Sequence, residues 1–136
     1  MKRQISKIAL VVRDYDEAIG YYTQKLGFAL TEDTVMGPGK RWVTIQPGEG
    51  EGPQIVLAKA KNETELAAVG NQTGGRVFLF LETDDFWRDY KKMATEGVDF
   101  TEQPRHETYG TVVVFRDLYG NKWDLVGPPS KEPPSG

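Results

Sequence analysis

Three polar residues, Gln54, Lys122 and Asp124, alternate with apolar residues in two short segments that read as strands. Successive side chains of a strand point to opposite faces, so these three residues lie on the face opposite to their apolar neighbours. We expect the apolar faces to pack against helices. The amide, ammonium and carboxylate groups would then face the concave side of the sheet, where a ligand can contact them.

His106 is the only histidine of the chain, and there is no cysteine. It stands between Arg105 and Glu107 near a turn, where a solvated surface histidine is the simple interpretation and a general base is the alternative. The lack of cysteine excludes disulfides, thiolate catalysis, iron–sulfur clusters and thiolate zinc sites. A single histidine cannot supply the two histidines of a non-haem iron centre.

The chain has 136 residues, of which 38% are hydrophobic and 27% are charged, with a formal net charge of −3. This length suits one globular domain. The basic residues are scattered, which disfavours a nucleic-acid or membrane partner. The apolar run at residues 8–12 is too short for a signal peptide or a membrane span. We therefore expect a cytoplasmic protein.

One pattern occurs twice, with an offset that carries Asp14 onto Asp84 (14 + 70 = 84). Each copy has an apolar run, an acidic residue, an amphipathic stretch, a glycine and three alternating segments, in the order βαβββ. The modules cover about residues 4–60 and 75–128, within one domain at 1–128. The strands are expected at 8–12, 28–31, 42–46 and 54–57 in the first copy and at 77–81, 98–101, 111–116 and 122–126 in the second.

The amphipathic stretches carry signals for helix ends. Asp14 can accept hydrogen bonds from the amides of the first turn, and Glu17 can reach back to it, which is the capping-box pattern. Gly27 and Gly97 follow the last apolar position of each stretch, where a left-handed residue ends a helix. The spacing therefore predicts one helix in each module.

Two segments lie outside the modules. Residues 61–74 link them and favour a short helix at 63–69. Residues 129–136 are rich in Pro, Gly and Ser and are expected to form a flexible tail, because they cannot bury enough apolar area to become ordered.

The tandem modules, residues 8–19, the Leu26–Phe28 step and the turn at 115–121 together resemble the vicinal-oxygen-chelate superfamily. This superfamily holds glyoxalase I, extradiol dioxygenases, and fosfomycin- and bleomycin-resistance proteins. The resemblance spans about residues 5–128. It implies an α+β fold with a cup-shaped mixed sheet, helices outside, and a homodimer.

The resemblance also implies where a metal would be held in the enzymes of this superfamily. Three of the four ligand positions fall on Lys7, Gln54 and Asp124. The fourth is Val77 by the repeat offset or Phe78 by the spacing to the second helix, and we favour Phe78 because that register turns Glu82 away from the helices. Lys7 brings a cation, and neither Val nor Phe donates a lone pair. Since Gln54 and Asp124 alone are too few ligands, we expect no metal and no other cofactor.

Lys7 and Asp124 are expected to meet where the metal would be. In one interpretation they only satisfy each other as buried charges. In the other, Lys7 or Asp124 orients a polar group of a ligand or exchanges a proton with it. Aromatic residues are candidate walls around this centre, as in many small-molecule sites, although each can equally be core packing. These wall candidates are Trp42, Phe78, Phe80, Tyr109 and Phe115.

The favoured function is metal-independent binding of an apolar or aromatic small molecule in the cup, similar to the bleomycin-resistance type. The alternative is a lyase, isomerase or epimerase that uses Lys7, Asp124 or His106 as acid or base without a metal. A glyoxalase-like activity with a divalent metal is the least favoured. The sequence does not say whether any reaction is catalysed.

Overall fold

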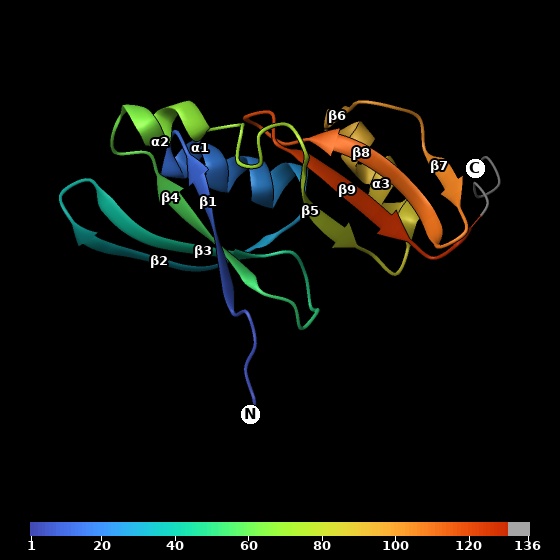
Figure 1. The fold of residues 1–136 in the computed structure, drawn as a ribbon, viewed down its shortest axis with the longest axis horizontal. Helices are drawn as coiled ribbons and strands as arrows, with labels where there is room; N and C mark the ends of the chain where they lie inside the picture. The colour runs from blue at the N-terminus through green and yellow to red at the C-terminus, as the bar shows by residue number, and fades with distance from the viewer. Residues whose placement is uncertain (131–136) are drawn as a thin grey trace. The chain divides into compact units, whose positions relative to one another are not determined.

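The structure, a computed structural model, describes residues 1–130, and Figure 1 shows its elements. It divides into two compact units, residues 1–72 and the residues from 73 onward. Most of the expected flexible tail, residues 131–136, lies outside the described residues. In the described part of the chain, no helix is long and apolar enough to cross a membrane.

The first unit is a mixed four-stranded sheet with the strand order β1-β4-β3-β2. β1 runs parallel to β4, and the other neighbours are antiparallel. Helix α1 continues into a π-helical turn, η1, and α2 follows β4 within the linker, as predicted. The elements are β1 (Lys7–Val12), α1 (Tyr15–Gly20), η1 (Tyr21–Lys25), β2 (Ala29–Gly37), β3 (Lys40–Gln46), β4 (Gln54–Lys59) and α2 (Glu63–Ala68).

The second unit repeats this arrangement in a five-stranded sheet with the order β5-β9-β8-β6, and β7 also pairs with β8. Again the first and last strands, β5 and β9, are parallel. The elements are β5 (Val77–Glu82), α3 (Phe86–Thr95), β6 (Asp99–Phe100), β7 (Arg105–Glu107), β8 (Gly110–Arg116) and β9 (Lys122–Gly127). The two units confirm the predicted α+β class and the tandem βαβββ modules.

Helix α1 begins where the capping pattern predicts. The Asp14 carboxylate accepts a hydrogen bond from the Glu17 amide at 2.8 Å. The Glu17 carboxylate accepts from the Arg13 guanidinium at 2.8 Å on the exposed side. After the π-helical turn, Gly27 adopts φ of 73°, which favours glycine and ends the helical stretch.

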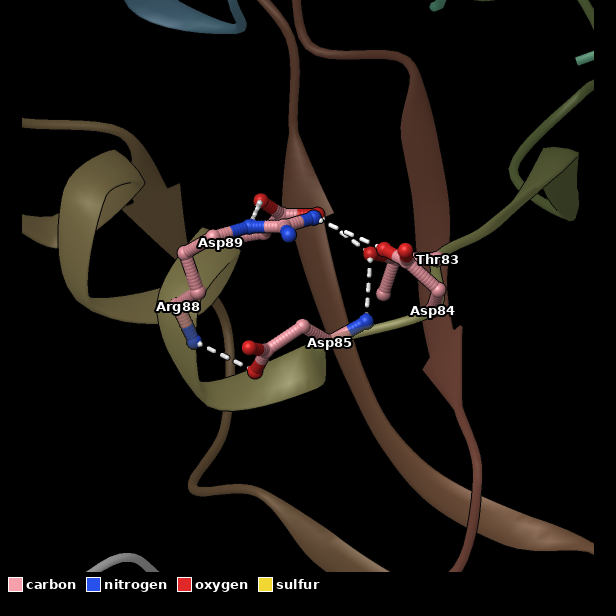
Figure 2. Close-up of polar contacts among 5 residues, drawn as sticks. All are labelled: Thr83, Asp84, Asp85, Arg88 and Asp89. Atoms are coloured by element: carbon pink, nitrogen blue, oxygen red, sulfur yellow. Dashed lines mark hydrogen bonds and ion pairs between the residues drawn. The ribbon is translucent and has the colours of Figure 1, made fainter. Parts of the chain in front are cut away.

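Helix α3 begins one residue later than the repeat offset suggests, because its N-cap is Asp85 and not Asp84. Figure 2 shows the contacts that fix this end: Asp85 accepts from the Arg88 amide at 3.2 Å, and the Thr83 hydroxyl accepts from the Asp85 amide at 3.1 Å. The Thr83 hydroxyl donates to Asp89 at 2.5 Å, and the Arg88 guanidinium pairs with both Asp84 and Asp89. Asp85 therefore caps the helix, and the other contacts hold the residues around this cap.

The turn between β8 and β9 is built around the buried carboxylate of Asp117. One carboxylate oxygen accepts from the amides of Tyr119, Gly120 and Asn121 at 3.0, 3.1 and 3.0 Å. The other accepts from the Asn121 side chain at 3.0 Å and from the Trp123 indole at 3.3 Å. The turn motif of the sequence thus has a structural role.

Each sheet buries one face against its helices, and we call this the helix face and its opposite the open face. In the first unit, Leu10, Ile45 and Leu57 are buried on the helix face with Tyr22. In the second unit, aromatic rings form a chain from α3 across the sheet. Successive centroids lie 5.8, 4.7, 6.3 and 5.9 Å apart in the order Phe86, Tyr90, Phe100, Phe115 and Trp123.

Three local features differ from the sequence prediction. β2 runs to Gly37 and forms a long exposed hairpin with β3, whereas its strand was expected only at 28–31. β7 was not predicted as a strand. Ser130, within the expected tail, is held to β8, because its amide donates to the Thr111 hydroxyl at 3.2 Å and its carbonyl accepts from that hydroxyl at 3.1 Å.

Candidate functional site

The open face of the first unit carries three of the predicted site residues. Lys7 pairs with Gln54 across β1 and β4, so both side chains lie on one face. Two residues beyond Gln54, Val56 pairs with Thr44 of β3, and alternation places Trp42 on that same face. Lys7 is exposed and Gln54 is half-buried. Trp42 is 37% exposed, so its ring is available to a ligand.

The open face of the second unit is centred on Asp124. This residue pairs with Phe80 of β5 on one side and with Val114 of β8 on the other. Asp124 is only 9% exposed, whereas Phe80 is 69% exposed. A buried carboxyl group therefore lies directly beside an aromatic ring that is open to solvent.

The carboxyl group of Asp124 is short of hydrogen-bond partners. In the part of the chain that the structure describes, its buried Oδ1 atom has none. Burial raises the pKa of Asp124, the nearby Arg105 charge opposes this, and Glu102 adds to it. Buried polar atoms are normally paired, so this atom is an open position for a hydrogen bond from a ligand.

Arg105 and two glutamates form an ion-pair group near Asp124. The Arg105 guanidinium donates to Glu102 at 2.8 Å and to Glu107 at 2.7 Å. Glu102 also accepts from the Val114 amide at 3.2 Å. Val114 lies between the residues of β8 that pair with β7 and those that pair with β6. Because Arg105 pairs with Val112, which pairs with Val126 of β9, it lies on the open face with Asp124. This group was not predicted from the sequence, although alternation within 105–107 separates Arg105 and Glu107 from His106.

Two predicted site residues, Phe115 and His106, lie on the helix face of the second unit. Phe115 pairs with Trp123, stacks on its ring and is fully buried in the core. The prediction that Phe115 lines the ligand site was therefore wrong, because its alternation follows the helix face. His106 pairs with Thr111, and its ring lies 6.5 Å from that of Trp87 of α3. It is exposed there and is separated from Asp124 by the sheet, as the surface interpretation expects.

An open hollow of about 430 Å³ lies beside His106. It is lined by His106, Glu107, Gly110, Thr111, Pro129 and Ser130. Among the described residues that line it, none has a buried side-chain atom without a hydrogen-bond partner.

Tyr109 and Phe78 are less closely tied to Asp124. Tyr109 stands in the turn between β7 and β8 and is 64% exposed. Phe78 lies at a shift of register between Val77 and Leu79, and its ring contacts that of Trp123 edge-on at 6.0 Å. Counting back from the helix caps makes Phe78 the counterpart of Lys7 (14 − 7 = 7 and 85 − 78 = 7). Strand pairing instead gives Phe80 as the neighbour of Asp124.

The residues at the family's ligand positions do not fit a divalent metal. Lys7 carries a cationic group, Gln54 offers one amide oxygen, and the candidates for the fourth position are Val77 and Phe78, with Phe80 beside Asp124. Asp124 is the one carboxylate among them. Among the described residues no group of three or more His, Cys, Asp or Glu side chains is arranged to hold a metal. We derive no metal chemistry from this donor set.

Comparison with known proteins identifies the family. A sequence model of the Glyoxalase/Bleomycin resistance protein/Dioxygenase superfamily matches residues 4–125. The chain belongs to this superfamily. It is 52% identical to an uncharacterized protein of Shewanella frigidimarina (strain NCIMB 400) over 134 residues. The matched region covers 98% of this chain and 99% of that protein.

Two solved structures have the same fold as this chain. The crystal structure of UcmS2 is 29% identical, covers 93% of this chain and 98% of its own, and has a TM-score of 0.80. TnmS3, an antibiotic binding protein from Streptomyces sp. CB03234, is 26% identical, covers 93% and 97%, and has a TM-score of 0.74. The expected superfamily and its α+β fold are thus confirmed.

Proposed function

We propose that this superfamily member binds an apolar or aromatic small molecule without a metal, in the manner of a glyoxalase/bleomycin-resistance-like binding protein. The observation that carries the proposal is the pairing of Phe80, which is 69% exposed, with the buried Asp124, whose Oδ1 atom lacks a partner among the described residues. An apolar surface with one convergent polar group is typical of small-molecule sites.

Two further observations support binding. The exposed Trp42 ring shares the open face of the first unit with Lys7 and Gln54, which offers a second aromatic surface with polar neighbours. TnmS3, which is similar in sequence and fold, is an antibiotic binding protein. Binding alone needs no catalytic group, which agrees with a ligand set that does not fit a metal.

The test is a thermal-shift screen of neutral aromatic compounds against the wild-type protein and two variants. A ligand that binds the folded state raises the melting temperature by mass action. We expect hits for the wild type, and smaller shifts for Phe80→Ala, which removes the exposed ring. Leu66→Ala is the control, because Leu66 is 53% exposed on α2 and outside the second unit. Equal shifts in all three proteins, or no hit at all, would count against the proposal.

The second candidate is a lyase, isomerase or epimerase that uses Asp124 as acid or base. The observation that favours it is the raised pKa of Asp124, caused first by burial, because a carboxyl group that titrates closer to neutrality transfers protons more readily. His106 is not its partner, because it lies on the helix face. Turnover of a panel of 2-oxo and CoA-linked substrates that Asp124→Asn abolishes would favour this candidate over binding alone.

A further inference from the structure

The polar group on the open face of the second unit has an excess of negative charge. Arg105 is shared between the carboxylates of Glu102 and Glu107, at 2.8 and 2.7 Å. One cation between two anions leaves the group with a net negative charge before Asp124 is counted. Of the other charged side chains on this face, Glu82 is offset by Lys122, and Arg116 is paired with Asp99. An anionic ligand beside Arg105 would therefore meet an excess of like charge.

Among the described residues, Asp124 is the buried group of this face that has a polar atom without a hydrogen-bond partner. Its cross-strand neighbours, Phe80 and Val114, have no polar side-chain atoms. Lys122 lies two residues earlier on the same face, and its ammonium group is directed toward the Gly75 carbonyl, to which it donates at 3.4 Å, before the start of β5. The Arg105 guanidinium is engaged by its two glutamates. A ligand that lies on Phe80 thus meets Oδ1 of Asp124 as the open polar contact.

The type of group that suits this contact follows from the chemistry of a carboxyl group. A hydroxyl group can donate to an ionised carboxylate and can accept from a protonated one, so it pairs with Asp124 in either state. A methyl group would leave the buried Oδ1 atom unsatisfied. A carboxylate would add an anion beside Glu102, Glu107 and Asp124.

Resting on the binding function proposed above, we infer that the open face of the second unit selects flat aromatic molecules that carry a neutral hydroxyl group and rejects their carboxylate counterparts. Asp124 is the partner of the hydroxyl group. Phe80 contacts the ring, and the Glu102–Arg105–Glu107 group disfavours the anion.

Three probes of nearly equal shape test this selectivity: 2-naphthol, 2-methylnaphthalene and 2-naphthoate, compared at pH 7 by equilibrium dialysis. The wild-type protein should bind 2-naphthol about 10-fold or more tightly than 2-methylnaphthalene, the factor that one hydrogen bond to a buried group gives. It should bind 2-naphthoate most weakly. Wild-type binding of 2-methylnaphthalene as tight as that of 2-naphthol would overturn the inference but leave the proposed binding function intact. Failure of all three probes to bind would overturn both.

Variants assign the selectivity to residues. Asp124→Leu should bind 2-naphthol and 2-methylnaphthalene equally, whereas Asp124→Asn, which keeps an acceptor and a donor, should retain the preference and guards against loss of folding in the Leu variant. Glu107→Gln should bind 2-naphthoate several-fold more tightly and leave 2-naphthol unchanged. Asp84→Leu removes an exposed carboxylate before α3 and is the matched control. A hydroxyl preference that survives in Asp124→Leu would overturn the role of Asp124.

Discussion

At the residue scale, Asp117 and Asp124 show what two carboxylates seven residues apart (124 − 117 = 7) do in different surroundings. Asp117 accepts hydrogen bonds on both oxygens, whereas Asp124 has a buried oxygen without a partner among the described residues. Asp117 therefore stabilises the turn between β8 and β9, whereas Asp124 is a candidate for contact with a ligand.

Replacing Asp117 with Ala should destabilise the protein by roughly 3 kcal/mol, because the amides of the turn and the Trp123 indole lose their acceptor. Urea unfolding measures the loss. Asp117→Asn keeps one carbonyl oxygen and should cost less than Ala. Equal, near-zero losses in both variants would show that the turn does not depend on this carboxylate.

The pH dependence of stability should carry the signature of Asp124. Burial raises the pKa of Asp124 in the folded state. The folded state therefore favours the protonated carboxyl group. The stability that this preference adds is complete below the unfolded pKa of about 3.9 and is lost as the pH rises through the folded pKa. Asp124→Asn cannot ionise, so its stability relative to the wild type should increase as the pH is raised from about 4 to 8. Urea unfolding across this range checks the trend, and the opposite slope would contradict it.

At the element scale, the ends of β8 and β9 depend on two glycines that pack without side chains. A Cβ at Gly127 would lie 2.7 Å from the Phe86 Cβ at the start of α3, and one at Gly110 would lie 2.3 Å from the Gly127 carbonyl oxygen. These contacts set how closely the first turn of α3 approaches the sheet.

Gly127→Ala should therefore destabilise the second unit by about 1–3 kcal/mol through overpacking. Gly48→Ala, where a Cβ has open space, is the matched control and should change stability by less than about 0.5 kcal/mol. Chemical denaturation of both variants makes the comparison. A harmless Gly127→Ala would mean that α3 shifts freely on the sheet.

Many features of the helices and strands could be predicted from the sequence, because strand alternation and helix caps are local signals. The strand faces around Gln54 and Asp124, the cap at Asp14 and the stop at Gly27 follow from them. The register shift at Phe78, the strand β7 and the placement of Phe115 could not be predicted in the same way. They depend on pairing with distant strands. Residues 112–115 are all apolar, so the face of Phe115 is set by its pairing with Trp123 and not by a local alternation.

At the scale of the whole molecule, the family membership and the module order are settled, while the assembly stays a prediction. The cytoplasmic location, the lack of a nucleic-acid partner and the meeting of Lys7 with Asp124 also stay predictions, and the last of these joins residues of different units. The sequence alone could predict which residues of the candidate site lie on the two open faces, because the strand pairing that sets each face lies within one unit.

A homodimer is expected in solution. β2 is an edge strand whose residues are exposed along nearly its whole length, with Leu30, Val35 and Met36 among them. Such edges are usually covered by another chain or protected. Sedimentation velocity at micromolar concentration should give the mass of two chains, and Val35→Lys should weaken the dimer. A wild-type monomer under these conditions would rule the dimer out.

Mapping of amide NMR shifts during a titration with 2-naphthol shows whether a small aromatic molecule binds on the open face of the second unit. We expect the largest shifts at Phe80, Val114 and Asp124, which pair across β5, β9 and β8. His106 and Thr111, which pair on the helix face, should move little. Shifts confined to His106 and Thr111, with Phe80 and Asp124 unchanged, would contradict the claim.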